Sequence, residues 1–512
     1  MGSIGSDGGG GANGPGASPA PGTDPSDPRL EARVWRLSPE QYNTEIQRLF
    51  PGAPPVSLTP GASEFGLSNI ASTARIDTGN ASQYVEGARS IANWVVDQGA
   101  SAARCDEFGT DACVNTYLDW AVEAAFRRPV SQMEKADLRA VYDSNVEDYG
   151  ADWAFGAMTR AMLTSPSFLY RTEIGADGVT GVFPIDGHEI ANLLSFTLTG
   201  HGADETLLAD AANLQDADVR ERHVRRLMPE AAPVFQQFLW QWLHMSTLES
   251  QGNETGLEPA LVAALEQEFE DFVANIVVEQ RGTVGDLLTS TSTWATPEVA
   301  SYYEVNHPGD GVAEIALNPD QRSGLLTLGA WLVAHGKRGR ANVVRRGMNV
   351  FIEAMCNGIT PIDIDLEAAL DDLVGPDATV KEIVEARAVD PSCGGCHSTA
   401  DPVGLAFEHF RGDGTWQDTY EDGNPVEVEV TVAGQEYSGA ISVSAALAED
   451  DSFRQCLVQR FGHFVMGHEF GDPLTVRASS EALAAFDDSG GAFEELLVAI
   501  IRDPAFIERR RN

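Results

Sequence analysis

The sequence predicts a mainly α-helical protein built from several domains. At 512 residues the chain is too long for one ordinary hydrophobic core, so more than one domain is expected. Apolar residues recur with the spacing of amphipathic helices through most of its length. One segment, 426–432, alternates apolar and polar residues as a strand does, which limits the clear β signal to a small hairpin.

The N-terminal third is predicted to contain a tether and two helical segments. Residues 1–30 are dominated by Gly, Pro, Ser, Ala and Asp and cannot bury a core. In the helical segment 31–100, Ser38 can cap a helix that starts at Pro39. A helical module, 101–178, follows. It contains a helix that stops before Pro129, with one apolar face made of Val114, Tyr117, Leu118, Ala121 and Ala125.

The remaining chain is predicted to form three modules. A Gly- and Asp-rich break precedes the central helical module, 183–315, and the whole block 187–335 is expected to be helical. The next module, 320–425, contains the segment CGGCH. The last, 426–512, begins with the β-hairpin and ends with two helices.

Charge and hydropathy exclude two classes of partner. The formal net charge is −43, which argues against nucleic acid and against anionic membrane surfaces. No stretch reaches the roughly 18 consecutive apolar residues that a membrane-spanning helix needs. We therefore expect no nucleic-acid partner and no transmembrane helix.

The segment CGGCH at 393–397 is the clearest chemical motif. Two thiols three residues apart on a first helical turn can bond both vinyl groups of a haem, and the adjacent imidazole then points at the iron. The preceding EIVEARAVDPS indicates a helix that ends before Pro391. The motif thus predicts a covalent haem c held by Cys393, Cys396 and His397, with His397 as the proximal iron ligand.

Two other interpretations of CGGCH remain open. A zinc site needs more ligands, usually from a second close pair, and the other cysteines are single. A thioredoxin-like dithiol would follow a strand rather than a helix. A structural disulfide or a reactive dithiol is still compatible with the sequence.

The distal haem ligand is open in the sequence. Met466 is a candidate, although it also suits the core face of an amphipathic helix, and thioether ligation is typical of electron carriers. His409, His463 and His468 are rivals. An open distal position would instead favour peroxide or oxygen chemistry.

The surroundings of His397 are also predicted. Its second ring nitrogen is expected to be oriented by a backbone carbonyl, which a loop at Pro402 can supply. Asp401 and Glu408 are expected to cap a helix rather than to bind the haem edge.

The other four cysteines are expected to form disulfides. Cys105 and Cys113 are close enough to close a small loop, and Cys356 and Cys456 would then pair across the haem module. An even cysteine count in an oxidising compartment supports this pairing, although the sequence does not fix the connectivity.

Several segments resemble one bacterial family in the same order along the chain. CGGCHSTADPVGLAFEHFRGDGTW is similar to the family's CxxCH…DPxGxxxExFD…GxW stretch, and LSPEQYNTEIQRLF to its N-terminal helix. EIANLLSFTLTGHGADETLLADA resembles its central module and FRQCLVQRFGHFVMGHEF its tail. The likeness covers about residues 33–508, with departures at Arg411, at Gly467-His468 and at 203–205.

This family is abundant in planctomycetes and myxobacteria. Its members are secreted or lipid-anchored and are built from tandem domains of unknown function, with a cytochrome-c-like motif near the C-terminus. The resemblance implies export, haem c and an undefined electron-transfer or oxidative role. It implies a periplasmic, outer-membrane-anchored or extracellular location. A Gly-rich tether is typical of the stretch after the lipid-bearing cysteine of a bacterial lipoprotein, so we expect an export signal and a lipid anchor at an N-terminus missing from this sequence.

Together these observations predict a mainly α, multidomain protein with a C-terminal cytochrome-c-like module and a small β-hairpin insertion. The predicted function is electron transfer with an unidentified redox partner or substrate. One alternative is a haem peroxidase or oxidase. Another is a haem-free, disulfide-stapled scaffold that binds a surface.

Overall fold

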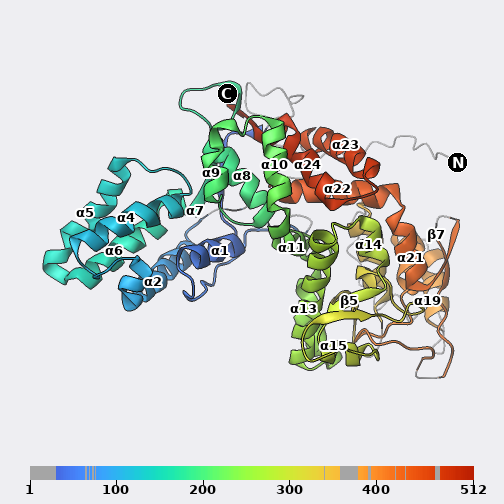
Figure 1. The fold of residues 1–512 in the computed structure, drawn as a ribbon. Helices are drawn as coiled ribbons and strands as arrows, with labels where there is room; N and C mark the ends of the chain where they lie inside the picture. Colours follow the sequence, from blue (N-terminus) through green and yellow to red (C-terminus); the bar gives the residue numbers. More distant parts are fainter. Residues whose placement is uncertain are drawn as a thin grey trace.

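The computed structural model describes residues 30–511 apart from 64–65, 69, 72–73, 75, 339–340, 358–378, 390–393, 421–422, 433 and 468–472. The described chain is mainly helical, as predicted, and its sheets are small (Figure 1). Its buried apolar side chains form two separate cores. One core lies in an N-terminal lobe, and the other is shared by the rest of the chain.

The N-terminal lobe is the blue and cyan group of helices in Figure 1. Its first helix begins as predicted: the Ser38 hydroxyl accepts from the Gln41 N–H at 3.2 Å, and Pro39 takes the first helical position. The predicted apolar face of residues 114–125 is buried in this core. In chain order the helices are α1 (Pro39–Leu49), α2 (Ala81–Gln98), α3 (Ala100–Ala103), α4 (Asp111–Phe126), α5 (Gln132–Tyr149), α6 (Ala151–Leu163) and α7 (Pro166–Leu169).

The central segment begins the second core. Its apolar stripe along residues 265–276 is buried, as the helical spacing predicts. Its helices are α8 (Gly187–Thr199), α9 (Glu205–Ala209), η1 (Ala211–Asn213), α10 (Ala217–Leu227), η2 (Met228–Glu230), α11 (Ala232–Trp242), η3 (Met245–Thr247), α12 (Leu248–Thr255), α13 (Pro259–Val273), the π-helix η4 (Ala274–Glu279), α14 (Val284–Thr289) and α15 (Pro297–Tyr302).

The C-terminal segments complete that core. Of the last helices, α24 lies beside α10 and α22 contacts α11, so the end of the chain packs against the central segment (Figure 1). The elements are η5 (Leu325–Thr327), α16 (Gly329–Ala334), α17 (Val343–Met348), the π-helix η6 (Asn349–Ala354), α19 (Val380–Val389), α20 (Gly394–Leu405), the predicted hairpin β7 (Glu429–Val432) and β8 (Gln435–Ser438), α21 (Gly439–Ala448), α22 (Asp451–Met466), α23 (Pro473–Asp488), α24 (Phe493–Arg502) and α25 (Pro504–Ile507).

The prediction that block 187–335 is entirely helical is wrong. Strands β5 (Ser292–Ala295) and β6 (Ala313–Ala316) pair antiparallel within it, with Thr293 opposite Ile315. Both of these side chains are buried. The sequence of β5, STWA, shows no alternation of apolar and polar residues, so its pairing with β6 decides its conformation.

Two small sheets that the sequence did not predict join distant parts of the chain. Strand β2 (Arg33–Arg36) pairs antiparallel with β3 (Tyr170–Glu173). Strand β9 (Glu508–Arg511) lies between β1 (Leu30–Glu31), which is parallel to it, and the antiparallel β4 (Gly181–Pro184). The two ends of the described chain therefore meet where the N-terminal lobe joins the second core.

A buried ion cluster holds this junction together. The Glu173 carboxylate lies 2.9 Å from Nε of Arg33 and 2.6 Å from Nε of Arg509, and it is 1% exposed. Burial opposes its ionisation, but the two guanidinium groups outweigh burial and lower the pKa of Glu173 to about 2. One carboxylate on β3 thus ties together β2 and β9.

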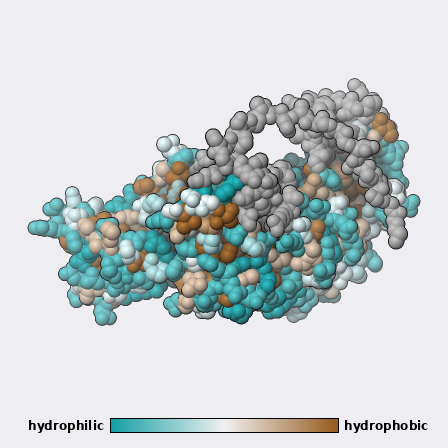
Figure 2. Space-filling view, turned by 90° about the horizontal axis from the view of Figure 1, so that it is seen from above, coloured by the Kyte–Doolittle hydropathy of each residue, from teal (hydrophilic) through white to brown (hydrophobic). Residues whose placement is uncertain are grey.

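The surface agrees with the charge of the chain. Figure 2 shows a mostly hydrophilic face over the described residues, with apolar side chains in small scattered groups. Within the described part, no helix is both long and apolar enough to cross a bilayer.

We expect Glu173→Gln to lower the free energy of unfolding by about 3–5 kcal/mol at pH 7, because it leaves the buried guanidinium of Arg509 and the partly buried one of Arg33 without their counter-charge. The control is Glu31→Gln, because the Glu31 side chain is 67% exposed and lies 3.8 Å from Arg510. A surface pair of this kind contributes at most about 1 kcal/mol. Urea unfolding of the three proteins measures the difference.

The same variant has a defined pH dependence. Because the pKa of Glu173 is lowered by folding, its contribution is fully present above the ordinary value of 4.5 and is lost as the pH falls towards 2. The unfolding free energies of the wild type and Glu173→Gln should therefore converge between pH 4.5 and 2. A constant difference across this window would contradict an ionised Glu173 as the source of the stabilisation.

Candidate functional site

The CGGCH segment lies at the start of α20. Cys393 falls outside the described residues, whereas Cys396 and His397 belong to the first turn of the helix. The side chain of Cys396 is also outside the described part. Within this segment, the geometry of the site is therefore known for His397.

His397 is held by a buried carboxylate on its own helix. Nδ1 of His397 lies 2.9 Å from Oδ1 of Asp401, one helical turn later. Asp401 is fully buried, and its other oxygen lies 3.2 Å from Nη1 of Arg387 on α19. A carboxylate accepts hydrogen bonds, so Nδ1 carries a proton, and in the neutral ring Nε2 keeps its lone pair for a metal.

This geometry corrects two expectations about the site. Pro402 lies inside α20 rather than in a loop, and a carboxylate, not a backbone carbonyl, orients His397. Asp401 binds His397 and Arg387 instead of capping a helix. Glu408 is also buried beyond the end of α20, where it accepts a hydrogen bond from the Tyr420 hydroxyl at 3.2 Å.

Two glycines set the position of α20 against α17. A Cβ at Gly404 would lie 1.9 Å from the carbonyl oxygen of Val343, and one at Gly347 would lie 2.0 Å from that of Ala400. No side chain fits at these distances, so the two helix backbones are in direct contact. The crossing point is three residues beyond His397, and it explains the glycine in the segment DPVG.

Arg346, which precedes one of these glycines, fixes the chain that leaves α20. The side chain is fully buried. Its guanidinium donates to four carbonyl oxygens at 2.6 to 3.2 Å. These belong to Leu332, Phe407, Phe410 and Arg411. One side chain therefore joins α16, α17 and the turn after α20.

The structure places the candidate distal ligands at different sites. Met466 is buried at the end of α22, and its carbonyl accepts from Arg33 at 2.6 Å, beside β2. None of the described contacts joins Met466 to His397. His409 stacks on Trp416 with ring centres 4.4 Å apart. His463 is buried on α22, and His468 lies outside the described residues. The distal ligand stays a prediction.

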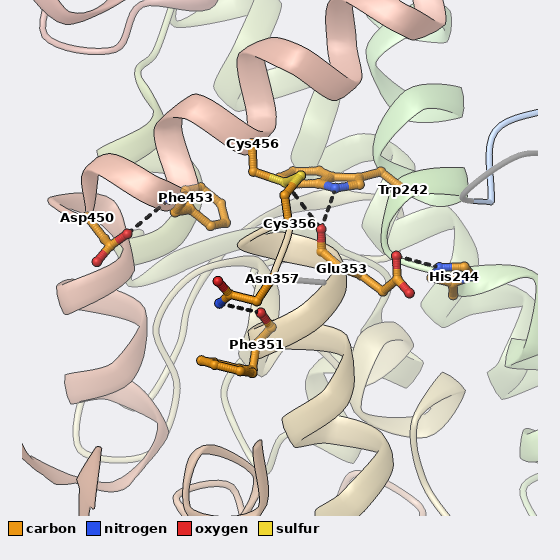
Figure 3. Close-up of a disulfide and its surroundings, with 9 residues drawn as sticks. All are labelled: Trp242, His244, Phe351, Glu353, Cys356, Asn357, Asp450, Phe453 and Cys456. Carbon is orange, nitrogen blue, oxygen red and sulfur yellow. Dashed lines mark hydrogen bonds and ion pairs between the residues drawn. A yellow bond between two sulfur atoms is a disulfide. The ribbon is translucent and has the colours of Figure 1, made fainter. Parts of the chain in front are cut away.

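Both expected disulfides are present. Cys105 pairs with Cys113, and Cys356 with Cys456. Figure 3 shows the second bond. It joins Cys356, two residues after the end of η6, to Cys456 on α22. The carbonyl oxygen of Glu353 lies 3.3 Å from Sγ of Cys456 and accepts from Nε1 of Trp242 at 3.1 Å. Of the six cysteines, the two in CGGCH remain outside these bonds.

The described residues contain no group of three or more His, Cys, Asp or Glu side chains arranged to hold a metal ion. Because Cys393 and the side chain of Cys396 lie outside these residues, the zinc interpretation of CGGCH is not tested by this finding. A haem iron needs a different environment, because the porphyrin supplies four of its ligands.

Three family models match the chain. Residues 322–420 match PSCyt3, a protein of unknown function (DUF1588). This match contains both CGGCH and the crossing of α17 with α20. Residues 185–305 match PSD4 (DUF1592) and residues 113–173 match PSD5 (DUF1595), both also described as proteins of unknown function.

These matches agree with the resemblance seen in the sequence. The three models are tandem domains of the planctomycete type that accompany cytochrome-c-like proteins, and they follow the expected order along the chain. No curated protein and no solved structure matches the chain.

Sequence reasoning missed the parts of the site that depend on another helix. The four-residue spacing of His397 and Asp401 was a signal, because such residues face each other on a helix. Arg387 and the backbone contact of Gly347 with Ala400 had no local signal. Both depend on how α17, α19 and α20 pack.

We expect Gly404→Ala to destabilise the protein by about 1–3 kcal/mol or more, because the added methyl group must push α20 away from α17. Gly462→Ala on α22 is the matched control, since a Cβ there has no neighbour within 4 Å. That change should stabilise the helix by about 0.5–1 kcal/mol. Thermal unfolding followed by circular dichroism compares them, and equal effects would contradict a tight helix crossing.

Proposed function

We propose that this chain is an exported c-type haem protein that transfers electrons. Cys393 and Cys396 would form the two thioether bonds, and His397 would bind the iron through Nε2. A covalently bound haem would supply a one-electron couple at its iron. The observation that carries the proposal is the pairing of His397 with Asp401, which leaves Nε2 available.

The cysteines support the same proposal. Two disulfides account for four of the six, which leaves the CGGCH pair for another use. Disulfides are stable in oxidising compartments, and c-type haem is attached outside the cytoplasm, so both features favour a periplasmic or extracellular protein. A lipid anchor remains part of the proposal, on the ground of the Gly-rich tether.

The partner of His397 favours a second candidate, a haem peroxidase or oxidase. A carboxylate that accepts from Nδ1 makes the imidazole a stronger donor to the metal than a neutral carbonyl does. A stronger donor stabilises the oxidised metal. Asp401 shares its charge with Arg387 at 3.2 Å, which moderates this effect.

A pyridine-haemochrome spectrum tests the haem. We expect protein exported by a host with c-type maturation machinery to show a c-type α band that stays with the denatured chain. The double variant Cys393→Ser/Cys396→Ser should lose it. The control Cys105→Ser/Cys113→Ser removes a disulfide from the N-terminal core and should keep it. A wild-type protein without the band, with Cys393 and Cys396 oxidised, would indicate a disulfide-stapled scaffold instead.

Asp401→Asn should raise the reduction potential by about 60–120 mV. This range corresponds to a 10- to 100-fold loss of preference for the oxidised metal, the usual effect of altering the partner of a ligating histidine. Asp418→Asn is the control, because Asp418 is exposed and its carboxylate binds Trp416. Spectroscopic redox titration measures both. Equal shifts in the two variants would show that Asp401 acts through its charge alone and not through His397.

A further inference from the structure

A cavity of about 480 Å³ lies next to the Cys356–Cys456 disulfide. It opens to the solvent and is lined by the chain around η3, the end of α16, and one face of α17 and η6. Polar and apolar side chains line it together. Those that matter here are His244, His335, Arg345, Met348, Ile352 and Glu353. Figure 3 shows two of them, His244 and Glu353, directed towards each other beside the disulfide.

The cavity and α20 occupy opposite faces of one helical segment. Arg345, Met348 and Ile352 recur at helical spacing and line the cavity. Val343 and Gly347 lie on the other face and contact α20. One helix, about 10 Å across, therefore separates the cavity from the helix that carries His397.

His335 presents an unpaired hydrogen-bond acceptor in the wall of the cavity. Its ring is 1% exposed, and Nε2 lies 2.9 Å from the carbonyl oxygen of Leu243. A carbonyl only accepts, so Nε2 carries the proton and Nδ1 keeps a lone pair. Nδ1 has no hydrogen-bond partner among the described residues. Burial lowers the pKa of His335 to about 3, so the ring is neutral at physiological pH.

The orientation of this ring is fixed by a buried network. The carbonyl of Leu243 also accepts from the Asn349 amide at 3.1 Å, and the amide oxygen of Asn349 accepts from Trp331 at 3.0 Å. The His335 ring lies against Trp331, with centres 5.0 Å apart. A buried acceptor is rarely left unpaired. We therefore expect Nδ1 of His335 to accept a hydrogen bond from a molecule outside the chain.

The cavity also holds two opposite charges. Nε2 of His244 lies 3.4 Å from Oε2 of Glu353, and this contact lowers the pKa of Glu353 and keeps the carboxylate ionised. The guanidinium of Arg345 is half-buried and makes no hydrogen bond within the described contacts. Met348 and Ile352 add apolar surface between these groups and the helix axis.

We propose that this cavity binds a small α-amino or α-hydroxy acid with an apolar side chain. Its carboxylate pairs with Arg345, and its ammonium or hydroxyl group donates to Nδ1 of His335. Its apolar side chain packs on Met348 and Ile352. A molecule with a donor next to a carboxylate can satisfy both the guanidinium and the unpaired imidazole nitrogen. The proposal does not depend on haem, because each of these contacts belongs to the protein.

Titration calorimetry with three probes tests the proposal on the full chain. Phenylalanine, 3-phenyllactate and 3-phenylpropionate share a ring and a carboxylate and differ at one position, which carries an ammonium, a hydroxyl or a hydrogen. We expect the first two to bind at least about tenfold more tightly than 3-phenylpropionate, the difference that one hydrogen bond to a buried acceptor makes.

Two variants test the carboxylate contact and the imidazole contact separately. Arg345→Met should weaken all three probes by about tenfold or more, whereas Arg222→Met, at an exposed arginine of α10, should leave them unchanged. His335→Phe keeps a ring but removes the acceptor, so 3-phenyllactate should lose its advantage over 3-phenylpropionate. Thermal unfolding without probe checks that each variant is folded.

Three results would overturn the proposal. Equal affinity for all three probes in the wild type would rule out donation to His335. Unchanged binding in Arg345→Met would rule out the carboxylate contact. No heat of binding at millimolar concentrations would mean that ordered water alone satisfies Nδ1.

Discussion

The contact of α17 with α20 at backbone distance is the constraint on which the C-terminal half of the molecule depends. Gly347 and Gly404 each face a carbonyl oxygen of the other helix, so neither helix can turn or slide without a clash. Ala400, which supplies one of these carbonyls, follows His397 by three residues. The crossing therefore sets where His397 stands and which face of α17 is left for the cavity.

Two buried arginines, Arg346 and Arg322, reinforce this arrangement by donating to backbone carbonyls. Arg346 donates to four carbonyl oxygens around the crossing. Arg322 does the same for Thr327 and Gly414, at 2.6 and 2.7 Å. Burial lowers the pKa of Arg346 to about 10, which still leaves it charged at neutral pH. The fork of donors on a guanidinium suits this use, because it can bind several carbonyls in one plane.

The sequence was informative where the determinants are local. Four features were predicted because they depend on the spacing of residues along the chain. They are the cap at Ser38, the helical faces, the hairpin after residue 425 and the two disulfides. The pairing of β1 with β9 was not, since it joins Leu30 to Arg509 and neither strand has a pattern of its own. In the site, the haem chemistry of CGGCH stays a prediction, and Arg387 and the helix crossing arise only from tertiary packing.

The segment formed by α17 and η6 is a common wall between two sites of different character. One face contacts α20 near His397, and the other carries Arg345 and lines the cavity. The wall is tied to α22 by the Cys356–Cys456 bond, which limits its movement. If ligand binding shifts α17 or η6, then either α20 must shift with them or α17 and η6 must deform. Because coupling between two binding sites is reciprocal, a ligand that alters binding at His397 must have its own affinity altered by the same factor.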